Sequence, residues 1–83
     1  MLNLLDEIDG RLTGMTIRWP ELRPEMLKIQ KHVKYALNND KITDLRQYLT
    51  DTRGRMTAAM VRFPELQEYF RPLTEKITKE LGG

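Results

Sequence analysis

Apolar residues recur at intervals of three and four along most of this chain. In the first half they form a stripe that continues past Pro20: Leu5, Ile8, Leu12, Met15, Trp19, Leu22, Met26, Ile29, Val33 and Leu37. A second stripe continues past Pro64 in the same way: Ile42, Leu45, Leu49, Met56, Ala59, Phe63, Leu66, Phe70, Leu73, Ile77 and Leu81. This spacing matches the period of an α-helix, and no stretch alternates apolar and polar residues over the length of a strand. The pattern predicts an all-α fold.

Pro20 and Pro64 predict where the helices break. A proline inside a helix removes a hydrogen bond and collides with the preceding turn, at a cost of about 3 kcal/mol, whereas the first helical position tolerates it. We therefore expect a turn at each proline and helices near residues 2–18, 21–37, 41–62 and 65–81. Because the phase of each stripe continues across its proline, the alternative is a kink within one long helix per half.

Two further features concern helix ends. Asn38, Asn39 and Asp40 predict a turn in which Asn39 or Asp40 caps the third helix. Pro72 falls in the middle of the fourth expected helix, which should either kink there or restart at Arg71 and Pro72.

The two halves of the chain resemble each other at an offset of 44 residues. Residues 17–22 read Ile-Arg-Trp-Pro-Glu-Leu, residues 61–66 read Val-Arg-Phe-Pro-Glu-Leu, and nine of 39 ungapped positions are identical. A shared helical period does not explain the shared glycine, arginine, threonine and proline residues. We therefore expect a tandem duplication within one helical domain, residues 1–83, with copies at 1–39 and 45–83 joined by residues 40–44. The period is typical of α-helical solenoid repeats, although two copies are fewer than such arrays need.

Each half predicts a helical hairpin, and two hairpins can bury their stripes against each other. The expected result is a small, pseudo-symmetric four-helix bundle. If each half were one long kinked helix, its stripe would be too extended for one chain to cover, and two chains would pair in a dimer. Because oligomerisation often supplements so small a core, a homodimer stays an open alternative.

Composition narrows the function classes. Apolar residues make up 40% and charged residues 31% of the chain, and 14 lysines and arginines against 12 acids leave a net charge of +2. So small an excess does not by itself predict a polyanionic partner. The absence of cysteine excludes disulfides and thiolate chemistry. No apolar run reaches the roughly 20 residues of a membrane span, and the acidic N-terminus lacks a basic leader, so we expect a cytoplasmic protein without membrane contact.

Matched polar and aromatic residues beside the stripes are the candidate partner-binding residues: Arg11, Arg18, Trp19, Arg55, Arg62 and Phe63. A guanidinium offers a planar fork that suits a carboxylate or a phosphate, so the arginines could dock a partner. The alternative is that they pair with acids of the same chain, namely Glu21, Glu25, Glu65 or Glu68. Trp19 and Phe63 should anchor the hairpin ends, and either would be an interface hot spot if exposed.

Glycine and methionine residues have simpler interpretations. Gly10 and Gly54 hold equivalent mid-helix positions, where glycine costs about 1 kcal/mol relative to alanine, and so predict a close helix approach or a bend. Four methionines on or beside the stripes are expected to fill the core: Met15, Met26, Met56 and Met60.

The second expected helix also carries a basic face, formed by Arg23, Lys28, Lys31, Lys34 and Tyr35. Lysines could contact phosphates while the tyrosine stacks on a base, which makes nucleic-acid binding the alternative function. Solvated lysines are, however, routine on the outer side of an amphipathic helix.

Nothing in the sequence predicts catalysis. His32 is the only histidine and has no acidic or histidine neighbours at ligand spacing, and serine is absent. No phosphate-binding glycine loop is present. We therefore expect no cofactor, no metal and no enzymatic activity. The leading hypothesis is a helical protein–protein interaction or assembly module that acts through apolar helix faces and the flanking arginines.

Overall fold

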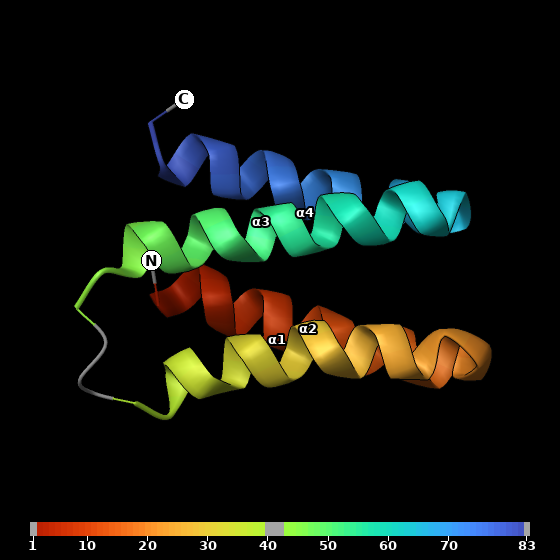
Figure 1. The fold of residues 1–83 in the computed structure, drawn as a ribbon. Coiled ribbons are helices and arrows are strands. Elements are labelled where there is room, and N and C mark those ends of the chain that lie inside the picture. Colours follow the sequence, from red (N-terminus) through yellow and green to blue (C-terminus); the bar gives the residue numbers. More distant parts are fainter. Residues whose placement is uncertain (1, 40–42, 83) are drawn as a thin grey trace.

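The computed structural model describes residues 2–39 and 43–82. Within these ranges the chain forms no strand, but four α-helices and two short 3₁₀ turns (Figure 1): α1 (Leu2–Arg18), η1 (Pro20–Leu22), α2 (Arg23–Leu37), α3 (Leu45–Arg62), η2 (Pro64–Leu66) and α4 (Gln67–Glu80). The all-α prediction is confirmed.

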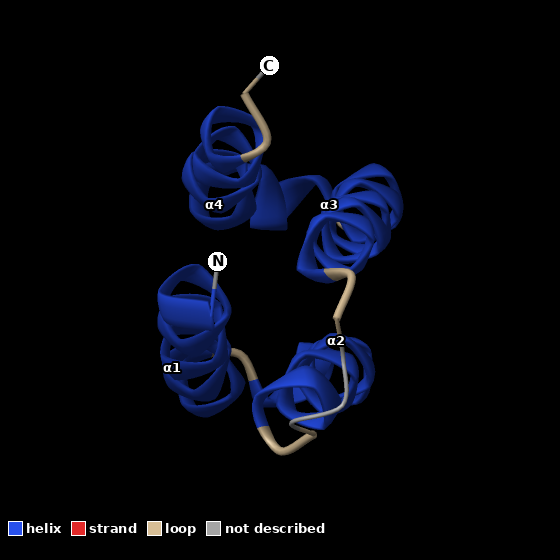
Figure 2. Ribbon diagram, turned by 90° about the vertical axis from the view of Figure 1, so that its left-hand side faces the viewer, coloured by secondary structure: helices blue, strands red, loops and turns tan. Residues whose placement is uncertain are grey.

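Each half of the chain forms a helical hairpin. The helix α2 runs back along α1 after η1, and α4 runs back along α3 after η2 (Figure 1). Seen end on, the helices occupy the four corners of a bundle, in which α1 and α3 each lie beside both α2 and α4 (Figure 2). The predicted bundle of two hairpins is therefore confirmed, and the alternative of long kinked helices is wrong. Tandem duplication, as the origin of the two hairpins, stays a prediction.

The two proline segments make the reversals. Trp19 and Phe63 leave helical geometry, with φ and ψ of −126° and 80° and of −129° and 83°, as expected for residues that precede proline. The carbonyl oxygen of each accepts a hydrogen bond from the backbone N–H group three residues later, at 3.0 and 2.9 Å. Pro20 and Pro64 are the first residues of the 3₁₀ turns, where a missing N–H group breaks no helical hydrogen bond.

The helix α3 begins later than expected, at Leu45 rather than at residue 41. Its N-cap is Asp44, whose carboxylate accepts a hydrogen bond from a backbone N–H group of the first turn at 3.0 Å. Asn39 does not cap α3, because it lies beyond the end of α2, where its N–H group donates to an α2 carbonyl at 3.4 Å. Asp40, the other expected cap, and residues 41–42 lie outside the described residues.

Pro72 does not restart the fourth helix, because α4 continues without interruption from Gln67 to Glu80. Inside the helix the proline loses one hydrogen bond and its ring crowds the carbonyl group one turn back, at a cost of about 3 kcal/mol. Phe70 and Leu73, on either side of it, are 0% and 1% exposed. Their burial contributes about 1.5–3 kcal/mol each, which is together enough to offset that cost.

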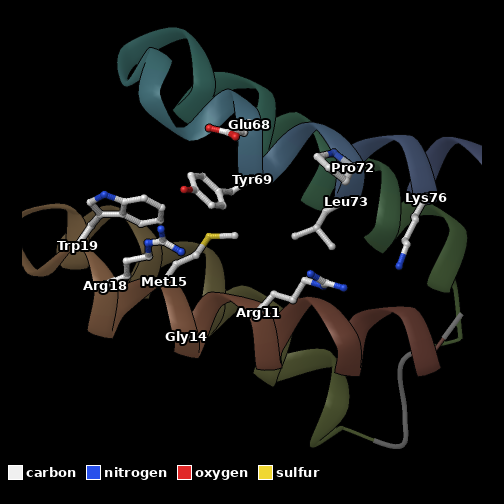
Figure 3. A pocket seen from close by; sticks show the side chains of 10 residues that line it. All are labelled: Arg11, Gly14, Met15, Arg18, Trp19, Glu68, Tyr69, Pro72, Leu73 and Lys76. Atoms are coloured by element: carbon white, nitrogen blue, oxygen red, sulfur yellow. The ribbon is translucent and has the colours of Figure 1, made fainter.

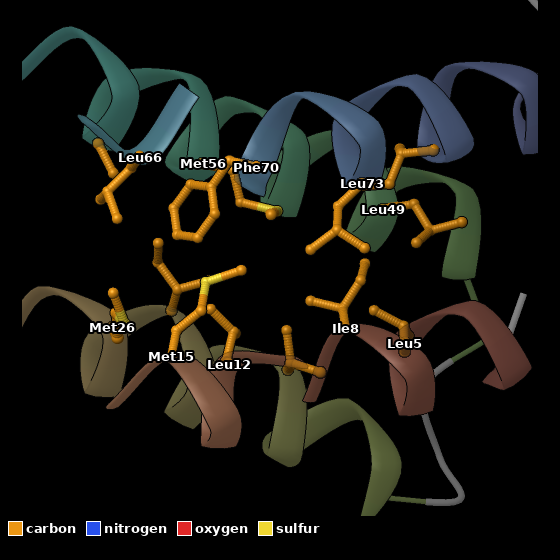
Figure 4. Close-up of a cluster of buried hydrophobic side chains, with 14 of the residues drawn as sticks. Leu5, Ile8, Leu12, Met15, Met26, Leu49, Met56, Leu66, Phe70 and Leu73 are labelled. Atoms are coloured by element: carbon orange, nitrogen blue, oxygen red, sulfur yellow. The ribbon is translucent and has the colours of Figure 1, made fainter. Parts of the chain in front are cut away.

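The core lies where the two hairpins meet (Figure 4). Its buried apolar residues are Leu5, Ile8, Leu12, Met15, Leu22, Met26, Ile29, Val33, Ala36, Leu49, Met56, Ala59, Leu66, Phe70, Leu73 and Ile77. All but Ile8 and Ala36 form pairs 44 residues apart, so the two hairpins contribute equivalent positions. The expected core role of the methionines is confirmed, with Met60 packed at the edge. The apolar stripes are therefore used by the fold itself.

Gly10 and Gly54 are exposed in the middle of α1 and α3. A Cβ atom added at either glycine would have no neighbour within 4 Å. The predicted close helix approach is therefore wrong, since the neighbouring helices pack on other faces of α1 and α3.

Candidate binding grooves between the hairpins

Two grooves follow the lines along which the hairpins meet. The wide groove, between α1 and α4, holds a hollow of about 450 Å³, and its lining includes Arg11, Gly14, Arg18, Tyr69, Pro72 and Leu73 (Figure 3). The narrow groove, between α3 and α2, holds about 140 Å³ and is lined by Arg55, Ala58, Arg62, Glu25, Lys28 and Ile29. These two sets correspond in the order given, at an offset of 44 residues. The grooves are equivalent in position but differ in side chains.

The narrow groove is filled by its own side chains. On α3, Nη2 of Arg62 lies 2.8 Å from Oε2 of Glu25 on α2, and the Glu25 side chain is only 18% exposed. Lys28 lies 3.8 Å from the other oxygen of that carboxylate. Further along the same two helices, the rings of His32 and Tyr48 stack with centroids 4.2 Å apart, and the Tyr48 hydroxyl donates to the His32 carbonyl. An ion pair and a stacked ring pair thus close this side.

The wide groove has no equivalent ion pair, because Tyr69 occupies the position that corresponds to Glu25. The Arg18 guanidinium lies 5.3 Å from the ring centroid of Trp19 and 5.5 Å from that of Tyr69. The two rings meet edge to face at 4.4 Å. No carboxylate among residues 2–39 and 43–82 lies within ion-pairing distance of Arg18. Arg18 is therefore held by cation–π contacts, and its hydrogen-bond donors have no carboxylate acceptor.

A charged cluster bridges α1 and α4 at the other end of the wide groove. Glu7 accepts a hydrogen bond from Nζ of Lys76, and Nε of Arg11 lies 3.4 Å from the same carboxylate. The hydrogen bond from Lys76 lowers the pKa of Glu7 from its usual 4.5. A second hollow of about 360 Å³ extends from Lys76 to Asn3. This side is thus hollowed from Trp19 to Asn3, about 24 Å along α1 at 1.5 Å per residue.

The structure divides the predicted partner-binding residues between the two grooves. Arg11, Arg18 and Trp19 line the wide groove, whereas Arg55 and Arg62 line the narrow one. Phe63, like Trp19, is partly buried and packs against the core at the end of its hairpin. One expected pair of arginine and acid does form, between Arg62 and Glu25, although it joins the two hairpins and does not lie within one.

Tyr69 is the groove residue that sequence reasoning missed. It contacts Trp19 and lies over Arg18, but nothing in its local pattern distinguishes it from other aromatic residues at the rim of a helix. The signal that could have found it is the offset alignment, which places Tyr69 opposite Glu25.

The predicted basic face of α2 is split. Lys28 belongs to the narrow groove, while Lys31 and Lys34 flank a separate hollow of about 350 Å³ beside Leu27. Tyr35 is 60% exposed. Arg23, the first residue of α2, is exposed and lines none of these hollows.

His32 lies inward from this face, against Tyr48. Burial, together with the positive charge of Arg55, lowers the pKa of His32 below 6.5. Burial also raises the pKa of Tyr48 above 10.0. Within the described part of the chain, no cluster of three or more histidine, cysteine, aspartate or glutamate residues could hold a metal ion. None of the described helices combines the length and the apolar character needed to cross a membrane.

Comparison of the chain with protein-family models, with curated proteins and with solved structures finds no match.

Proposed function

We propose that the chain is a non-enzymatic helical interaction module that holds a helical segment of a protein partner in its wide groove. One observation carries this proposal. The α1–α4 side keeps two hollows, of about 450 and 360 Å³, which meet at the Lys76–Glu7 ion pair, whereas the equivalent α2–α3 side is filled by Glu25, Arg62, His32 and Tyr48.

The residues of the wide groove suit a protein partner. Met15 and Leu73 form an apolar floor, with Trp19 and Tyr69 at one end and the Arg18 guanidinium beside both rings (Figure 3). Tryptophan, tyrosine and arginine are the residue types that most often dominate binding energy at protein interfaces. The length of about 24 Å accommodates roughly four turns of a helix laid along the groove, a common mode of peptide recognition.

The apolar helix faces have a different role in this proposal from the one expected from sequence. Because the stripes are buried between the hairpins, they are not available to a partner as a whole (Figure 4). The partner instead contacts the groove floor, together with Arg11 and Arg18. Self-association and a cytoplasmic location stay predictions.

Nuclear magnetic resonance spectra of the ¹⁵N-labelled protein test the proposal. The probes are three synthetic amphipathic peptides of about 16 residues, which share a leucine face and carry glutamine, glutamate or lysine on the other face. Binding in the wide groove should shift the indole N–H signal of Trp19, the only tryptophan of the chain, and the backbone signals of Gly14 and Tyr69.

A matched pair of variants supplies the control. Gly14 and Ala58 are exposed and hold equivalent positions in the wide and narrow grooves. Gly14→Leu places a side chain into the wide groove and should abolish the shifts, whereas Ala58→Leu should leave them intact. If no peptide perturbs Trp19, or if the two variants behave alike, the wide groove is not the binding site. Salt-sensitive shifts of Lys31, Lys34 and Tyr35 with a single-stranded oligonucleotide would favour the nucleic-acid alternative.

A further inference from the structure

The narrow groove shows how the chain itself places a carboxylate between two helices. Glu25 projects from α2 onto Arg62 of α3, at 2.8 Å, and remains only 18% exposed. Ile29 and Ala58 line the same groove. The chain therefore contains, within one of its two equivalent sites, an occupied example of carboxylate binding.

The wide groove has an arginine equivalent to Arg62 but no acid at the position equivalent to Glu25. Arg18 corresponds to Arg62, and Leu73 corresponds to Ile29, but Tyr69 stands in place of Glu25. Gly14 replaces Ala58, and the hollow is about 450 Å³ instead of about 140 Å³. There is thus room for a side chain from outside, next to an arginine that has no carboxylate partner among residues 2–39 and 43–82.

The charges around the wide groove favour the same kind of occupant. Its lining carries three cations, Arg11, Arg18 and Lys76, against one anion, Glu68. Glu7, at the rim, is already shared by Lys76 and Arg11. Arg18 alone among the three cations has no carboxylate partner within the described residues.

Arg18 is also held ready for binding. Its guanidinium lies against the rings of both Trp19 and Tyr69, so less side-chain entropy is lost when it binds a partner. A guanidinium pairs with a carboxylate through parallel hydrogen bonds, and partial exclusion of water strengthens that pair.

We infer that the occupant of the wide groove is an acidic amphipathic helix, one carboxylate of which binds Arg18 as Glu25 binds Arg62. Its apolar side chains lie on Met15 and Leu73, and further acidic side chains face Arg11 and Lys76. This inference rests on the proposed function and adds the chemical class of the partner. A free anion would use only the Arg18 end, whereas a helix also covers the apolar floor that runs along α1.

Isothermal titration calorimetry with the three peptides tests the inference. The glutamate peptide should bind about tenfold more tightly than the glutamine peptide, the scale of one charge-assisted hydrogen bond, and the lysine peptide should bind most weakly. Arg18→Gln should remove most of this preference for the glutamate peptide, because only the contributions of Arg11 and Lys76 remain. Arg55→Gln removes the same charge from the narrow groove and should leave both affinities unchanged.

A second variant builds the missing acid into the chain. Tyr69→Glu should place a carboxylate beside Arg18, as Glu25 lies beside Arg62, and so compete with the carboxylate of the peptide. The variant should keep its helical circular dichroism. Loss of the Tyr69 ring weakens every peptide, but the new carboxylate should weaken the glutamate peptide about tenfold more than the glutamine peptide, so the preference for glutamate should disappear.

The outcomes separate the two proposals. If all three peptides bind in the wide groove with equal affinity, or if Arg18→Gln and a folded Tyr69→Glu leave the preference for the glutamate peptide unchanged, the acidic partner is wrong but the groove remains a protein-binding site. If no peptide binds, both proposals fail. If a single-stranded oligonucleotide displaces the glutamate peptide and binds more tightly, the inferred partner class is wrong.

Discussion

Replacing Gly10 and Gly54 with alanine is expected to stabilise the protein. Both glycines are exposed in the middle of long helices, and an added Cβ atom would have no neighbour within 4 Å. Alanine should therefore contribute its full helix propensity without steric cost, about 0.5–1 kcal/mol at each site. Because the two sites lie on different hairpins and share no neighbour, the double variant should gain about 1–2 kcal/mol.

Urea and thermal unfolding followed by far-ultraviolet circular dichroism measure this gain. In a domain of this size, each kcal/mol raises the melting temperature by about 4–8 °C. Gly82→Ala is the matched control, because Gly82 has a φ of +83° at the end of α4, where alanine is strained and should lower stability by up to about 1 kcal/mol. A loss of stability in Gly10→Ala or Gly54→Ala would refute the reasoning, since it would mean that another part of the protein, or a second copy, packs against these glycines.

Three further predictions concern the core and two titrating groups. Phe70 is completely buried, so Phe70→Ala should lower the free energy of unfolding by about 3–5 kcal/mol, and a loss below about 1 kcal/mol in urea would contradict the core assignment. Because burial lowers the pKa of His32 below 6.5, the unfolded chain takes up a proton first, and stability should fall as the pH drops below about 6.5. Urea unfolding of His32→Gln should show a weaker fall over that range, and an unchanged pH dependence would assign the effect to other groups. Because Lys76 donates to its carboxylate, Glu7 should titrate below 4.5 by nuclear magnetic resonance, and Lys76→Gln should return the midpoint toward 4.5.

The helices and their reversals could be predicted from sequence because their causes are local. The apolar period defines the buried faces, and Pro20 and Pro64 disfavour helical geometry at the residues before them. The start of α3 was harder to place, because Asn39, Asp40 and Asp44 are all acceptable caps and only the path of the chain selects Asp44. At Pro72 the helix does not restart, because the buried residues around the proline outweigh the local preference, and a kink there stays a prediction.

The site could be predicted only in part. The arginines were found because they recur beside the stripes, and the pairing of Arg62 with an acid of the chain was anticipated. That Arg18 has no such partner in the described part of the chain depends on α1 lying beside α4, a tertiary contact that no local pattern reveals. The role of Tyr69 depends on the same contact, because its ring faces Arg18 only once the two hairpins have packed together.

The difference between positions 25 and 69 has a consequence for how such a molecule can change. In a symmetric dimer of identical hairpins, any substitution would appear in both grooves, so neither groove could stay unchanged while the other varied. Here a single polypeptide encodes the two positions separately, with glutamate at one and tyrosine at the other. The narrow groove can therefore hold the two hairpins together while substitutions in the wide groove change what it recognises, at little risk to folding.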